Sequence, residues 1–170
     1  LPQTAITRWN GLLFEAGRDI EADLKDLGVA RDLDFSDYVF HSQQIESYEG
    51  NWKTFIEVYL EDYHVNPFHP GLGRFVECKD LAWQFGERYS VQTVGIRNGL
   101  ARAGSLIYEN WHRAVLARGD LPSFGAIWLT YYPNLMVEWY PHTLVISTVQ
   151  PDGPRRYRNI VEFYYPKDIV

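Results

Sequence analysis

Two histidines and several carboxylates lie close together in the segment 51–70, NWKTFIEVYLEDYHVNPFHP. His64 and His69 are five residues apart, and Glu61 precedes the first histidine by three residues. Imidazole nitrogens suit Fe(II), and one added carboxylate completes a facial triad that leaves coordination positions open for oxygen and substrate. The residue types therefore indicate the ligand chemistry of a non-haem iron site.

A local break in the chain is needed to bring these two histidines together. Residues five positions apart on a continuous helix point in different directions around its axis, so they do not easily hold one metal ion. Asn66-Pro67 supplies such a break, since proline lacks a backbone N–H and disfavours helical conformation in the residue before it. The spacing predicts a helix over 50–65, with His64 in its last turn and His69 in the turn that follows.

The composition is that of one globular domain. The chain has 170 residues, of which 46% are hydrophobic and 16% aromatic, enough for a sizeable core. Its net charge is -6 and it has no basic stripe, so nucleic-acid binding has little support. No apolar run approaches the ~20 residues of a membrane span and no signal peptide opens the chain, so we expect no membrane partner and a cytoplasmic location. The single cysteine, Cys78, excludes an internal disulfide and a multi-cysteine metal cluster within this chain.

The remaining pattern predicts helices packed on an antiparallel sheet. Extended segments are predicted over 5–15 (with a turn at 10–11), 37–49, 83–97, 125–132, 135–150 (broken near 141) and 155–166. A helix is predicted over 105–118 in addition to 50–65, and a helix or turn over 19–28. Short polar turns between the late strands imply an antiparallel meander. The predicted fold class is therefore α+β.

The motif-bearing region resembles the catalytic domain of the alpha subunit of Rieske-type aromatic-ring-hydroxylating oxygenases. The resemblance rests on the string NWK, followed by E-x-x-L-E-D-Y-H and, after a gap of four residues, by H-P. It also rests on the later segment from YYPNLMVEWY to EFYYPKD. It covers roughly residues 40–170, and WNGLLFE looks like the trailing edge of a Rieske domain. We therefore expect 1–27 to be that trailing edge or a linker, and 28–170 to be a partial catalytic domain.

This resemblance implies a helix-grip (START/Bet v 1-like) fold, incomplete in this chain, in which an antiparallel sheet holds a helix. It implies O2-dependent mono- or dioxygenation of an aromatic or other small organic substrate at a mononuclear Fe(II). Electrons are expected to pass from NAD(P)H through a separate reductase or ferredoxin to a Rieske [2Fe–2S] cluster in the full-length parent. The parent is expected to be a homotrimer in which the cluster of one subunit serves the iron of its neighbour.

The resemblance also assigns roles to three residues. His64 and His69 match the two histidine ligands of the iron. Glu61 matches the acidic residue that connects the neighbour's cluster-binding histidine to an iron-ligating histidine. That role is chemically reasonable because a ligating imidazole usually donates its other N–H to a carboxylate. The substrate-binding residues are not indicated by the motif.

The chain departs from the family pattern in two respects. The cluster motif needs two cysteines and two histidines, and this chain has one cysteine. The family's third iron ligand is an aspartate in a helix beyond the last strand, whereas Asp168 follows the strand in a predicted loop and is not assigned as a ligand. The chain therefore matches the middle of a longer alpha subunit. The alternative is an incomplete domain that has lost iron binding.

Two other functions remain open at this point. One is a metal-free helix-grip domain that binds a hydrophobic ligand, and the other is a folded but inactive interaction domain of an oligomer. Metal analysis separates them, because bound iron at His64 and His69 favours the enzyme and a metal-free cavity with bound apolar ligand favours the binding domain.

We predict that the isolated chain, supplied with a reductase and no other oxygenase subunit, forms no product from aromatic substrates. The reason is that a single cysteine cannot hold a Rieske cluster. Chromatographic detection of a hydroxylated product in this assay would contradict the prediction.

Overall fold

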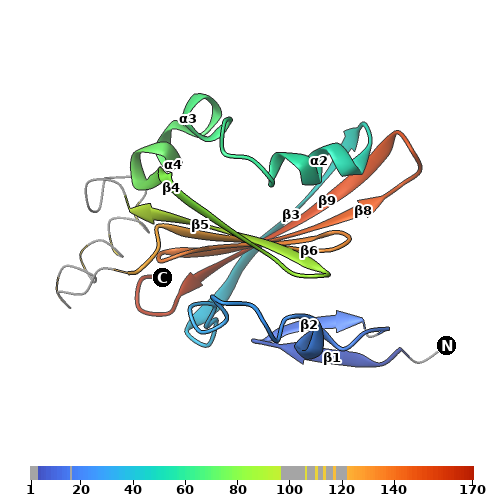
Figure 1. Ribbon diagram of the computed structural model, residues 1–170, viewed down its shortest axis with the longest axis horizontal. Helices are drawn as coiled ribbons and strands as arrows, with labels where there is room; N and C mark the ends of the chain where they lie inside the picture. The colour runs from blue at the N-terminus through green and yellow to red at the C-terminus, as the bar shows by residue number, and fades with distance from the viewer. Residues whose placement is uncertain are drawn as a thin grey trace.

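The centre of the protein is an antiparallel sheet. The computed structural model describes residues 4–15, 17–96 and 122–170, with four single positions between the last two ranges. The sheet strands are β3 (Tyr38–Glu49), β4 (Val76–Phe85), β5 (Tyr89–Ile96), β6 (Ala126–Tyr131), β7 (Leu135–Tyr140), β8 (Thr143–Pro151) and β9 (Arg156–Pro166). They form one seven-stranded sheet in the order β3-β9-β8-β7-β6-β5-β4 (Figure 1). The predicted α+β class and antiparallel meander are confirmed, because each strand from β4 to β9 pairs with the next.

Helices and a hairpin cover the two faces of this sheet (Figure 1). Helices α2 (Trp52–Val58), α3 (Val65–Phe68) and α4 (Pro70–Phe75) lie on one face. The hairpin of β1 (Ile6–Trp9) and β2 (Leu12–Glu15), followed by α1 (Ile20–Asp23), lies on the other. Both faces of the central strands are therefore buried, and β6 is buried along its whole length. In the described ranges, no helix has the length and apolar character needed to cross a bilayer.

The pleat of the central strands sends alternate side chains to opposite faces. Leu129 of β6 and Val137 of β7 are paired in register and pack in the core beneath α1. Trp128 and Tyr140, from the alternate positions of the same strands, pack in the core beneath α3 and α4. One sheet thus serves two separate cores, and a register shift of one residue would exchange their side chains.

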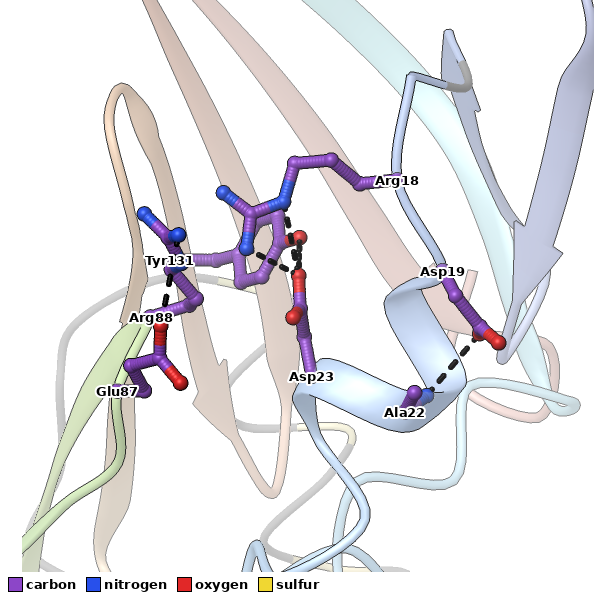
Figure 2. A network of polar contacts seen from close by, with 7 residues as sticks. All are labelled: Arg18, Asp19, Ala22, Asp23, Glu87, Arg88 and Tyr131. Carbon is purple, nitrogen blue, oxygen red and sulfur yellow. Dashed lines mark hydrogen bonds and ion pairs between the residues drawn. The ribbon is translucent and has the colours of Figure 1, made fainter.

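A polar network connects α1 and the segment before it to the sheet (Figure 2). Asp23 accepts a hydrogen bond of 2.5 Å from the Tyr131 hydroxyl of β6 and forms an ion pair of 2.5 Å with Arg18. Asp19 caps α1 by accepting a hydrogen bond from the backbone N–H of Ala22. The hydrogen bond from Tyr131, together with the nearby Arg18, holds the pKa of Asp23 below its usual value against the opposing effect of burial.

The predicted helix over 50–65 is wrong in its length. Helix α2 ends at Val58, and the next helix begins only at Val65. At the end of α2 the carbonyl of Tyr59 accepts a hydrogen bond from Nε2 of Gln92 in β5, which satisfies an acceptor that a helix end leaves unpaired. Asn66-Pro67 lies within α3 rather than after a helix, and proline in a first helical turn loses no helical hydrogen bond.

Two other predicted elements differ from the structure or lie outside it. The strand predicted over 83–97 is the hairpin of β4 and β5, with a turn at Gly86 where a Cβ would lie 2.1 Å from the Tyr89 ring. The break predicted near 141 within 135–150 is confirmed, because β7 ends at Tyr140 and β8 begins at Thr143, and the helix or turn predicted over 19–28 contains the short helix α1. The helix predicted over 105–118 falls outside the described residues except at four single positions.

Replacing Tyr131 with phenylalanine should destabilise the fold by about 1 kcal/mol at neutral pH, because Asp23 loses one of its hydrogen-bond donors and keeps Arg18. Folding lowers the pKa of Asp23 from 3.8. The stabilisation by its hydrogen bond is therefore fully present above pH 3.8, and it is lost as the pH falls through the lower pKa of the folded state. Thermal unfolding followed by circular dichroism should show a difference in Tm that narrows below about pH 4. Tyr63→Phe, at a position that is 86% exposed, is the control and should match the wild type. A constant Tm difference at all pH values would contradict the proposed charge dependence.

Candidate active site

A cavity of about 330 Å³ lies between the helices and the sheet. Its walls are mainly apolar and aromatic, with a few polar groups, as is typical of small-molecule sites. Both walls contribute polar or aromatic groups to the cavity: Glu61, His64 and His69 come from the helical segment, and Trp128, Glu138 and Tyr140 from β6 and β7.

The structure brings the two histidines together at this cavity. Their ring centres are 5.2 Å apart and their planes make an angle of 81°. His64 directly precedes α3, and His69 lies between α3 and α4. The two histidines therefore lie close together, as predicted. The short helix α3 between them brings this about, rather than the end of a long helix.

The arrangement of the two imidazoles fits two ligands of one metal ion. Imidazoles that bind one ion at neighbouring positions, each with a metal–nitrogen distance of about 2 Å, have ring centres about 5 Å apart. Burial, and the nearby charge of His64, lower the pKa of His69, which favours the neutral form that binds metals. Within the described residues, no three His, Cys, Asp or Glu side chains are grouped as a complete metal site. The histidines' role as ligands therefore stays a prediction.

Glu61 holds His64 in one orientation. Its Oε1 lies 2.5 Å from Nδ1 of the His64 ring, and its Oε2 accepts a hydrogen bond of 3.2 Å from the His64 backbone N–H. An ionised carboxylate only accepts hydrogen bonds, so this contact assigns the ring proton to Nδ1. The lone pair of Nε2 is then free to bind a metal ion.

Glu138 is a cavity residue that sequence reasoning missed. It lies on β7, where its carboxylate accepts hydrogen bonds from the hydroxyls of Tyr59, at 2.8 Å, and Tyr140, at 2.9 Å. Burial raises the pKa of Glu138, and the two hydroxyl donors act in the opposite direction. A single charged residue within the otherwise apolar run LMVEWY was the available signal, because glutamate is seldom buried without a partner.

Comparison with protein families identifies the domain. The family model described as the ring hydroxylating alpha subunit (catalytic domain) matches residues 30–170. The chain belongs to this family. Membership confirms the resemblance to the alpha-subunit catalytic domain that the histidine motif and the late strands predict.

Curated relatives with related sequences agree with this assignment. A putrescine 2-hydroxylase of Ralstonia nicotianae is 61% identical over 172 residues, which cover 100% of this chain and 47% of the relative. A putrescine 2-hydroxylase of Bordetella bronchiseptica is 54% identical over 163 residues, which cover 95% of this chain and 38% of the relative. A chloroplastic choline monooxygenase of Arabidopsis thaliana is 27% identical over 115 residues, which cover 67% of this chain and 24% of the relative. The chain thus spans less than half of the length of these relatives.

Solved structures support the fold. A quaternary ammonium Rieske monooxygenase in complex with an inhibitor aligns with a TM-score of 0.69 at 16% identity, covering 95% of this chain and 41% of that chain. A dicamba monooxygenase aligns with a TM-score of 0.57 at 13% identity, and the alignment covers 98% of this chain and 51% of that chain. The predicted helix-grip type of fold is therefore confirmed.

We predict that Glu61→Gln in the full-length protein lowers product formation by about 10- to 100-fold, because the amide no longer provides the charge that holds and polarises the His64 ring. Iron content should stay near one ion per site, since the nitrogen proposed to bind iron is unchanged. The measurements are product formed per reduced cluster and iron per protomer. Glu57→Gln, on the exposed side of α2, is the matched control. Normal turnover would make Glu61 an ordinary surface carboxylate, and loss of iron would place it among the ligands.

Proposed function

We propose that the full-length protein hydroxylates a small organic substrate with O2 at a mononuclear non-haem Fe(II) held by His64 and His69. The observation that carries this proposal is the pair of imidazoles at one cavity, one of them oriented by Glu61. Fe(II) with open coordination positions supplies the activation of O2 when it is bound.

The residues of the chain itself have three tasks in this proposal. Glu61 keeps the proton of His64 on Nδ1, so that Nε2 faces the metal position as a neutral ligand. The apolar and aromatic walls limit the water around the reacting groups, which strengthens electrostatic interactions in the cavity. Glu61 also connects the iron site to the electron donor, as the family resemblance implies.

The electron supply is proposed to come from outside this chain. NAD(P)H would reduce a separate reductase or ferredoxin, which in turn reduces the Rieske [2Fe–2S] cluster of a neighbouring subunit in a homotrimer. The family assignment supports this arrangement, and a solved relative is described in terms of inter-subunit electron transfer. We place the end of the Rieske domain or a linker in residues 1–27, the catalytic domain in 28–170, and the protein in the cytoplasm.

An aliphatic amine is the proposed substrate, in place of the aromatic compounds that the family name suggests. Two relatives with 61% and 54% identity are named putrescine 2-hydroxylases. Putrescine is a straight-chain diamine whose amino groups are protonated at neutral pH, like the side chain of lysine. The cavity of about 330 Å³ is of a suitable size for such a small molecule.

Iron analysis of the full-length protein tests the proposal. His64→Ala and His69→Ala should each reduce iron per protomer at least about tenfold, because each removes a ligand from an incompletely filled coordination sphere. His41→Ala, at an exposed position on β3, should leave iron content unchanged. Iron retained in both cavity variants would contradict the ligand assignment. A wild-type protein without iron that retains an apolar ligand would favour the metal-free binding domain instead.

A further inference from the structure

We propose that Glu138, together with the aromatic side chains beside it, forms the subsite that binds a protonated primary amino group of the substrate. This inference rests on the proposed function, because it concerns the same cavity. It adds the residue that selects the substrate, which neither the histidine motif nor the family assignment provides.

The position of Glu138 suits this role. It lies on β7 and is paired in register with Trp128 on β6, so both side chains project from the sheet toward the helices. His64 and His69 reach the same cavity from the helical segment on the opposite side. A substrate whose amino group contacts Glu138 therefore lies in the same cavity as the two histidines.

The hydrogen bonds around Glu138 all support its negative charge. The indole N–H of Trp128 only donates, and it donates to the Tyr140 hydroxyl at 3.0 Å. The Tyr140 hydroxyl donates in turn to Glu138, at 2.9 Å, and Tyr59 donates to the other carboxylate oxygen at 2.8 Å. These donors are arranged for an ionised acceptor, and they occupy only part of its acceptor capacity, which is about four lone-pair sites.

In the described part of the chain, no lysine or arginine pairs with this carboxylate. Its hydrogen-bond contacts there are the two tyrosine hydroxyls, at 2.8 and 2.9 Å. Placing a carboxylate in a mainly apolar cavity is unfavourable unless a cation compensates its charge. A ligand that brings an ammonium group would provide this compensation.

The surrounding rings favour a cation as well. Phe55, Tyr59, Trp128 and Tyr140 line the same cavity, and aromatic faces attract ammonium groups. A primary ammonium also donates hydrogen bonds to the free lone pairs of Glu138, whereas a trimethylammonium has no proton to donate. The site should therefore prefer putrescine to choline.

Binding measurements on the full-length protein test the inference without relying on turnover. Isothermal titration calorimetry in the absence of O2 should show putrescine binding to the wild type, and at least about tenfold weaker binding to Glu138→Gln. Glu87→Gln, which removes a carboxylate that is 87% exposed in the turn between β4 and β5, is the matched control and should bind like the wild type. Circular dichroism establishes that each variant is folded.

Each outcome decides the proposal. Weaker binding only in Glu138→Gln supports it, and equal binding in Glu138→Gln and the wild type overturns it. If Glu138→Gln does not fold, the wild type decides, because tighter binding of putrescine than of choline supports the subsite and the reverse overturns it. A wild type that binds no putrescine also overturns it. Iron content and O2-dependent hydroxylation of the same wild-type sample show separately whether the proposed function holds.

Discussion

The pleat of the central strands determines which side chains reach the cavity. In β6 and β7, alternate residues face either the N-terminal hairpin and α1 or the helices α2 to α4. The register that pairs Leu129 with Val137 also pairs Trp128 with Glu138. Packing of the apolar core on one face thus fixes the polar and aromatic residues on the other, because a shift of one residue would bury Glu138 in the wrong core.

Tyr59 carries the constraint from the sheet to the helical segment. Its backbone carbonyl accepts a hydrogen bond from Gln92 of β5, and its hydroxyl donates to Glu138 of β7. The end of α2 is therefore attached to two strands. The next residues contain Glu61 and His64, whose positions relative to the sheet depend on this attachment. The geometry of the two histidines is consequently a tertiary property as much as a property of their local sequence.

The sequence was sufficient to predict the late strands, because turn residues and alternating apolar positions are local signals. It also predicted that His64 and His69 meet, since a five-residue spacing across Asn66-Pro67 requires a break in regular helix. The position of the break was wrong, however, because the contact between Tyr59 and Gln92 joins residues 33 positions apart and leaves no local trace.

Glu138 was overlooked for a related reason. Its two hydrogen-bond donors, Tyr59 and Tyr140, are identifiable only once the helix end and the strand lie against each other. Within its own strand it follows Val137 and precedes Trp139, so alternation alone marks it as a position on one face of a sheet. The hairpin turn at Gly86 was missed as well, since the close approach of the Tyr89 ring that requires glycine there exists only in the folded chain.

We infer that the cavity between α2–α4 and the sheet is an iron site held by His64 and His69. Anomalous diffraction at the iron absorption edge, from crystals of the full-length protein, tests this claim most directly. We expect one iron peak within bonding distance of Nε2 of both histidines, while Nδ1 of His64 keeps its contact with Glu61. An iron peak elsewhere in this domain, or ordered histidines with no iron peak between them in an active preparation, would contradict it.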